Sequence, residues 1–169
     1  MPLNQSQKSL SPIGDAHLRA IGAICVNWSV IEMGMELAIL GLYEIDSRRG
    51  LPLTANIGFQ SRLALLRILA TQGAIKDTDE AKACTKILNR IEAAYPKRNA
   101  AAHGLWEPTK VPQVARRMSI RAKGARLRCT NEPVTVAELE EIATMLLVLH
   151  VDFADLMKRL GLGRELIAE

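Results

Sequence analysis

The sequence is poor in several residue types that mark particular protein classes. Aromatic residues make up only 4% of its 169 residues, so aliphatic and small side chains must form the core, which suits packed helices. The three cysteines, Cys25, Cys84 and Cys129, are far apart and form no CxxC pair. We therefore expect neither a disulfide framework nor a zinc site. We expect reduced thiols in a cytoplasmic protein instead.

The chain also lacks the pattern of a targeting or membrane segment. Its first 13 residues are polar and contain proline, unlike a secretory signal. The apolar stretch 20–43 is long enough to raise the question of a membrane span. Glu32 and Glu36 lie near its centre, where an acid costs about 2.5 kcal/mol or more. We therefore expect a soluble chain with no membrane partner.

Apolar residues recur at helical spacing over four segments. Thr135 and Glu138 have the spacing of a capping box, whereas Pro96 should kink or restart the third helix. Four amphipathic helices predict a mainly α fold, an up-and-down four-helix bundle in one domain at 12–169 after a flexible tail at 1–11. The expected helices lie at about 12–43, 58–71, 77–104 and from 135 onward, with a loop at 47–55 and a β-hairpin at 113–130 between the third and fourth helices.

Two charged residues lie on the apolar stripes of these helices. Glu32 falls between Trp28 and Met35 in the first helix, and Arg98 continues the stripe of the third. An unpaired buried ion costs several kcal/mol, so opposite charges on two stripes of one bundle predict a pair. The alternative is that both are solvated, because heptad and true helical periods diverge along a long helix.

The end of the third helix brings three reactive groups within about one turn. Asn99 and His103 are four residues apart and share a helix face. Arg98 is beside that face, but its long side chain can reach the same place. We therefore expect a guanidinium, an amide and an imidazole to meet there.

The segment from Arg98 to His103, RNAAAH, resembles the R-x(4–6)-H motif of HEPN domains, which often have a polar residue straight after the Arg. The resemblance covers about residues 12–105 and 135–160. It implies a bundle of four to five helices with the motif late in the third main helix. It also implies a homodimer in which two motifs face one cleft. Many members are metal-independent endoribonucleases without a cofactor, whereas others are inactive or act as binding modules.

The residue types fit RNA cleavage without a metal ion. Histidine has a pKa near neutrality, so His103 can take the proton of the 2′-OH or protonate the leaving oxygen. Arg98 is a planar donor for the negative charge that gathers on phosphorus. Asn99 could bind the phosphate or fix the imidazole tautomer, and Glu32 could orient Arg98 or His103. The expected products have 2′,3′-cyclic phosphate and 5′-OH ends.

The histidines also have simpler interpretations. His103 alone could be a helix-end residue that bonds the last carbonyls. His17 is expected to be solvated, and His150 to be structural. Some toxin-type HEPN proteins carry a Tyr two residues after the motif His, where a partner transferase modifies it, but this chain has Leu105 there.

The predicted hairpin is basic. No acid occurs between Pro108 and Asn131, while the whole chain carries a net charge of only +4, so the rest of the chain is net acidic. Strand alternation puts Arg117 and Arg121 on one face and Met118 on the other. Such cations suit the RNA backbone rather than its bases; the alternative is a solvated edge hairpin. The cations of this segment are Lys110, Arg116, Arg117, Arg121, Lys123, Arg126 and Arg128.

The sequence thus favours an RNA-directed, homodimeric protein, a ribonuclease of the toxin or phage-defence type with an antitoxin protein as a further expected partner. The first alternative is a non-catalytic module of similar fold that binds RNA, a nucleotide or a partner protein. The second is a purely structural helical dimer in which the motif is fortuitous.

Overall fold

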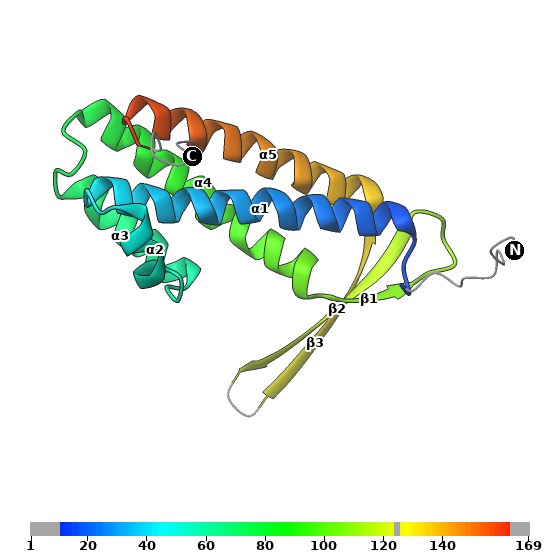
Figure 1. Cartoon of the computed structure of the whole chain (residues 1–169). Helices are drawn as coiled ribbons and strands as arrows, with labels where there is room; N and C mark the ends of the chain where they lie inside the picture. Colours follow the sequence, from blue (N-terminus) through cyan, green and yellow to red (C-terminus); the bar gives the residue numbers. More distant parts are fainter. Residues whose placement is uncertain (1–10, 124–125, 163–169) are drawn as a thin grey trace, which may run out of the picture. The chain divides into compact units, whose positions relative to one another are not determined.

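A computed structural model describes residues 11–123 and 126–162 of the chain. The described part is mainly helical, with one small antiparallel sheet of strand order β1-β2-β3 (Figure 1). Most of the predicted tail at 1–11 lies outside it. The elements are α1 (Asp15–Leu42), α2 (Ser47–Thr54), α3 (Phe59–Thr71), α4 (Thr78–His103), β1 (Leu105–Pro108), β2 (Val114–Lys123), β3 (Arg126–Thr135) and α5 (Val136–Arg159).

The chain divides by its internal contacts into two compact units. The sheet unit contains residues 11–25 and 97–144, and the helical unit contains residues 26–96 and 145–162, as far as each is described. Helices α1, α4 and α5 each contribute residues to both units.

In the helical unit, three of the few aromatic residues gather into one cluster. The ring of Phe59 stacks on Tyr95 at a centroid distance of 4.2 Å, and Trp28 lies 5.2 Å from Phe59 and 5.8 Å from Tyr95. Such pairs contribute beyond their buried area. Aliphatic residues complete the core, as the composition predicts; the fully buried ones include Ile31, Met35, Ile39, Leu63, Leu66, Leu88, Ile91, Leu146 and Leu149.

The predicted loop at 47–55 is wrong, because helix α2 occupies it. Asp46 caps this helix by accepting a hydrogen bond from the backbone N–H of Arg49 at 3.3 Å. The sequence suggested a loop because of Gly50, but this residue is buried within α2. A Cβ at this position would collide with the side chain of Leu40, so only glycine fits there. Close helix packing, rather than a turn, accounts for that glycine.

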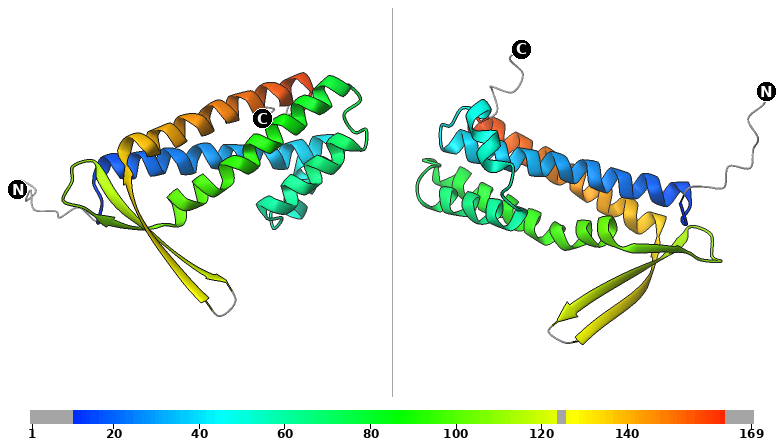
Figure 2. Two further views of the ribbon diagram at one scale, coloured as in Figure 1. Left: turned by 180° about the vertical axis from the view of Figure 1, so that it is seen from behind. Right: turned by 60° about the horizontal axis from the view of Figure 1, so that its bottom comes forward.

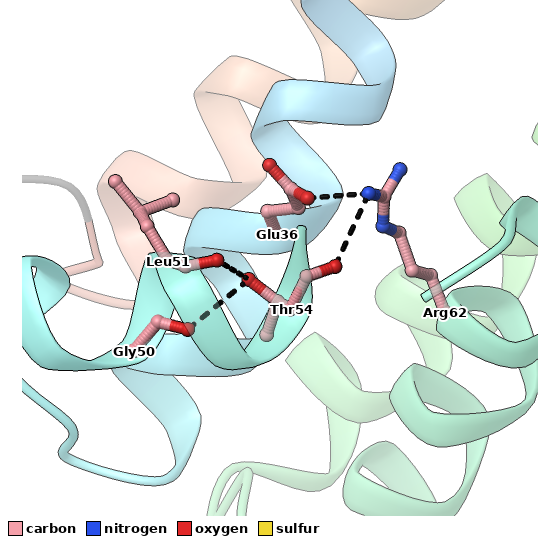
Figure 3. Close-up of polar contacts among 5 residues, drawn as sticks. All are labelled: Glu36, Gly50, Leu51, Thr54 and Arg62. Carbon is pink, nitrogen blue, oxygen red and sulfur yellow. Dashed lines mark hydrogen bonds and ion pairs between the residues drawn. The ribbon is translucent and has the colours of Figure 1, made fainter. Parts of the chain in front are cut away.

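A buried ion pair joins α1, α2 and α3 (Figure 3). The carboxylate of Glu36 on α1 contacts the guanidinium of Arg62 on α3, and both side chains are nearly buried. The same guanidinium nitrogen donates to the backbone oxygen of Thr54 on α2 at 3.4 Å. A buried pair needs such extra partners because desolvation is costly.

The stripe of α1 differs from the predicted one. Ile31 is fully buried where a heptad pattern placed Glu32, which is only half-buried, and Leu18 is 41% exposed. The fully buried positions Ile24, Trp28, Ile31 and Met35 cover three turns in 11 residues, about 3.7 residues per turn, which is closer to the 3.6-residue period of a straight helix than to the 3.5-residue heptad. Glu32 is therefore not a core residue of α1.

Helix α4 passes through Pro96 as one element, so of the two predicted outcomes, a kink or a restart, the restart is wrong and the kink stays a prediction. Pro96 is exposed, and the carbonyl that it leaves unbonded can bond water. The helix begins as expected, because the carboxylate of Asp77 accepts the backbone N–H groups of Asp79 and Glu80 at 2.8 and 3.1 Å. Buried residues before and after the proline, Ala94 and Ala101, keep the helix packed.

In the sheet unit, β2 and β3 form the predicted hairpin, and β1 is an additional strand. β1 pairs only with 115–118 of β2, so the hairpin continues beyond it as a two-stranded ribbon (Figure 2). β3 extends to Thr135, where the predicted capping box forms. The Thr135 N–H donates to Glu138 at 2.7 Å, and the Glu138 N–H donates to the Thr135 hydroxyl at 3.1 Å.

Among the described helices, α1 alone is long and apolar enough to cross a membrane by length and composition. The core helix of a soluble protein passes the same test, and 44% of the most apolar stretch of α1 is buried within the fold. The helix is therefore only a weak indication of a membrane span, and the absence of a membrane partner stays a prediction.

Candidate functional site

The three motif residues meet at the C-terminal end of α4, within the sheet unit. The Nη1 atom of Arg98 donates to Oδ1 of Asn99 at 3.0 Å and lies 3.2 Å from Nε2 of His103. Arg98 and Asn99 are half-buried and His103 is exposed. The predicted juxtaposition is thus present, with the guanidinium as the group that contacts both of the others.

This geometry suits a phosphate ester. A guanidinium nitrogen at 3.2 Å from the imidazole makes Nε2 the acceptor in that contact when His103 is neutral. Nε2 has a single lone pair, so it can take a proton from a hydroxyl group once the Arg98 N–H donates to another acceptor, such as a phosphate oxygen. One turn of helix therefore presents a proton acceptor beside a fixed cation, and the imidazole remains accessible from solvent.

Trp106, rather than His103, donates a hydrogen bond to a backbone carbonyl at the end of α4. The indole N–H of Trp106 donates to the backbone oxygen of Ala101 at 3.1 Å. Ala101 is in the last turn of α4, where carbonyls lack helical partners. The contact described for His103 goes to Arg98 instead. This arrangement disfavours the interpretation of His103 as a simple carbonyl-bonding residue.

Arg117 of β2 packs against the residue that follows the motif. A Cβ built on Gly104 would lie 2.7 Å from Cγ and 2.9 Å from Cδ of Arg117. The aliphatic stem of Arg117 therefore lies directly over the Gly104 backbone, and its guanidinium pairs with Glu132 of β3 at 2.6 Å. The base of the basic hairpin is thus adjacent to the motif.

The predicted RNA-binding cations differ in their surroundings. Arg116 and Arg128 are exposed, whereas Arg117 is largely covered and paired with Glu132. The backbone register places Arg121 opposite Arg128. The side chains of Arg121, Lys123 and Arg126 lie outside the described part of the structure.

Glu32 is in the helical unit and the motif is in the sheet unit, so the supporting role of Glu32 stays a prediction. His17, expected to be solvated, is 5% exposed, so that expectation is wrong. His150 is half-buried, which agrees with a structural role.

Sequence reasoning missed two residues at the motif. Glu132 is just beyond the acid-free segment, and only the strand register shows that it faces Arg117. The other is Trp106, because nothing in the sequence indicates that its indole reaches back to α4. Within residues 11–123 and 126–162, no group of three His, Cys, Asp or Glu side chains could hold a metal ion.

No family model, curated protein or solved structure matches this chain.

Proposed function

We propose that this protein is a HEPN-like, metal-independent endoribonuclease. The observation that carries the proposal is the contact of Arg98 with His103 at 3.2 Å beside Asn99. A cation, an amide and an imidazole are what cleavage by the neighbouring 2′-OH needs.

The cleavage step follows from the residue types. His103 takes the proton of the 2′-OH, whose oxygen attacks phosphorus, and the bond to the 5′-oxygen breaks. That oxygen leaves with a proton, giving a 2′,3′-cyclic phosphate and a 5′-OH. Arg98 stabilises the charge on the phosphoryl oxygens, and Asn99 orients Arg98 through the bond at 3.0 Å. In a homodimer, His103 of two subunits would divide the base and acid roles.

The hairpin supplies the contacts to the RNA backbone. Its base adjoins Gly104, the residue after His103, so a strand bound along β2 and β3 would reach the motif. Arg116 and Arg128 are exposed and available to phosphates.

The proposal includes a cytoplasmic location, an up-and-down bundle of the HEPN type with the hairpin as an insertion, and a toxin or phage-defence role that an antitoxin protein inhibits.

The test is cleavage of a mixed cellular RNA pool in EDTA, by the wild type and by the variants His103→Ala and Arg98→Ala. Loss of one proton-transfer group lowers the rate by about 10²–10⁴-fold, and loss of the phosphate donor by about 10²–10³-fold. Arg19→Ala, an exposed α1 position, is the matched control. Absence of cyclic-phosphate ends from a folded dimeric wild type would overturn the proposal.

One observation favours a second function, the binding of a partner protein without catalysis. Ile120 and Leu127 of the hairpin are 67% and 79% exposed, and Cys129, the register partner of Ile120, is also exposed. Exposed apolar residues that adjoin one another are typical of interaction surfaces. A folded sample that binds a partner protein through the hairpin but leaves RNA uncut would support this function.

A further inference from the structure

One face of the helical unit is apolar and is not covered by any described part of the chain. It is formed by α1 and α5, which lie side by side (Figure 1), with a groove of about 200 Å³ between them. Among the described residues that line this groove, none is Asp, Glu, Lys or Arg. The lining residues include Val30, Met33 and Leu37 of α1 and His150, Ala154 and Met157 of α5.

Large apolar side chains on this face are exposed. Val26, Val30 and Met33 of α1 are 63%, 41% and 49% exposed. Leu147 and Val151 of α5 are both 49% exposed. Their spacing of three or four residues puts them on one side of each helix. Together they expose on the order of 400 Å² of apolar surface, within the range of about 300–600 Å² for the largest patch on a monomer, which is often functional.

The exposed stripe of α1 is separate from the stripe that the helix contributes to the core. Only 44% of the most apolar stretch of α1 is buried within the fold. The apolar side chains at 26, 30 and 33 are therefore not needed to hold one copy together, and their burial requires a second surface. The core stripe is fully buried and consists of Ile24, Trp28, Ile31 and Met35.

Two acidic residues of these helix segments form ion pairs with other helices. Glu36 of α1 pairs with Arg62 of α3. Asp152 of α5 pairs with Arg90 of α4. Lys158, an exposed residue one turn after Ala154, is a charged residue at the rim of the face. The centre of the face, around the groove, is therefore uncharged.

This combination of shape and chemistry favours a second copy of the chain as the partner. In a two-fold dimer the same face of both copies meets, and like charges placed opposite each other would weaken binding. An uncharged face avoids this cost. Val30 and Met33 form a ridge beside the groove, so the ridge of each copy can enter the groove of the other. We propose that this face is a homodimer interface in which these two ridges and grooves interlock.

The size of the face also suits a dimer. One side of a standard interface buries about 800 Å², of which about 60% is apolar. The exposed apolar surface of this face is close to that share. Its residues all belong to the helical unit, so it contains no residue of the motif or the hairpin. The interface therefore goes beyond the proposed ribonuclease activity and does not depend on it.

The test is the mass of the full chain in solution without RNA, measured by sedimentation velocity over a range of concentrations. The wild type should self-associate, and Met33→Glu or Val151→Glu should halve the mass. Each substitution brings like charges into the contact, which should weaken association by about 10²-fold or more. Both positions are exposed in one copy, so the fold should survive. Ile68→Glu, at a position 46% exposed on α3 of the same unit, is the matched control and should keep the wild-type mass.

The methionine methyl groups report where the contact forms. The chain has six Met residues, so ¹³C-methyl labelling gives few signals, and Met33→Leu and Met118→Leu assign two of them. The Met33 signal on α1 should shift as the concentration rises, whereas the Met118 signal on the hairpin should not. A shift of Met118 with Met33 unmoved would place the contact at the hairpin and overturn the proposal.

Deletion of residues 163–169 tests a cover from within the chain, because these residues follow Leu162, which lines the groove. The shortened chain should associate as the wild type does. Association of the shortened chain alone would assign the face to the deleted segment and overturn the proposal, as would a monomeric wild type or a mass that both Glu variants leave unchanged. A dimer that loses association in the Glu variants but leaves RNA uncut would support this interface and count only against the proposed function.

Discussion

The stem of Arg117 lies over the backbone of Gly104, so that β2 and the end of α4 meet with no room for a side chain at the glycine. Gly104 directly follows His103, and Arg117 is paired with Glu132 of β3. One close approach therefore connects the motif to both strands of the hairpin.

Gly104→Ala should destabilise the protein by about 1–3 kcal/mol, the usual cost of overpacking. The new Cβ would lie 2.7 Å from the backbone oxygen of Ala100, which cannot move without distorting α4. RNA cleavage should fall with it, because His103 is the preceding residue. Urea unfolding gives the stability, and the EDTA cleavage assay gives the rate.

Gly22→Ala is the matched control for Gly104→Ala. Gly22 is in α1, and a Cβ there would meet no atom within 4 Å. The substitution should stabilise the protein by about 0.5–1 kcal/mol, since alanine loses less backbone entropy in a helix. Equal effects of the two substitutions would contradict the close approach of Arg117 to Gly104.

Glu132→Gln should strengthen RNA binding. The substitution removes the carboxylate that pairs with Arg117 at 2.6 Å, so the guanidinium becomes available to a phosphate. Each additional phosphate contact raises the slope of log affinity against log salt by about 0.7 for a single strand. Fluorescence anisotropy with a labelled RNA at several salt concentrations measures both quantities.

Glu140→Gln on the exposed surface of α5 adds the same charge without freeing Arg117. If it raised affinity and salt slope as much as Glu132→Gln, general charge rather than this ion pair would be the cause. If neither variant bound RNA, the proposed function itself would fail, which is a separate outcome from failure of the ion-pair argument.

Contacts within about one helical turn were predictable from the sequence. The Thr135–Glu138 cap and the contact of Arg98 with His103 both join residues at most five positions apart, so helical spacing alone indicates them. The basic hairpin was also predictable, because alternation and its turn residues are local. What these predictions share is that no distant segment has to be placed.

The remaining features depend on packing between distant segments. Heptad spacing put Glu32 in the core, but the period of a straight helix buries Ile31 instead. Gly50 indicated a loop, but the residue is within α2, where the side chain of Leu40 leaves no room for a Cβ. His17 is 5% exposed and lines one pocket with Pro112 and Gln113 of the turn before β2, an arrangement that no periodic pattern predicts.

The capping box of α5 should make stability depend on pH. The backbone N–H of Thr135, and then its hydroxyl, hold the pKa of Glu138 below its ordinary value of 4.5. A carboxyl group whose folded pKa is lowered contributes stability that is complete above its unfolded pKa and is lost as the pH falls through the folded pKa. Glu138→Gln should therefore be less stable than the wild type at pH 7, with a difference that shrinks below about pH 4.5.

Urea midpoints from pH 7 down to pH 3 measure this difference for Glu138→Gln, with Glu140→Gln as the control outside the cap. The wild type should lose more stability than Glu138→Gln over the acid range. A difference between the two that stayed constant from pH 7 to pH 3 would show that the carboxylate is not held by Thr135.

The Glu36–Arg62 pair should be the most sensitive polar contact of the helical unit. Glu36→Gln leaves the Arg62 guanidinium nearly buried without its counter-ion, which costs about 3–5 kcal/mol. Glu92→Gln breaks an exposed pair with Arg67 and should cost about 0–1 kcal/mol. The double variant Glu36→Leu/Arg62→Met removes both charges, so it should recover much of the loss. Urea unfolding of the three variants measures these free energies. A double variant that is less stable than Glu36→Gln would contradict this prediction. It would show that the hydrogen bond from Arg62 to the Thr54 backbone oxygen stabilises the packing of α2 more than the ion pair does.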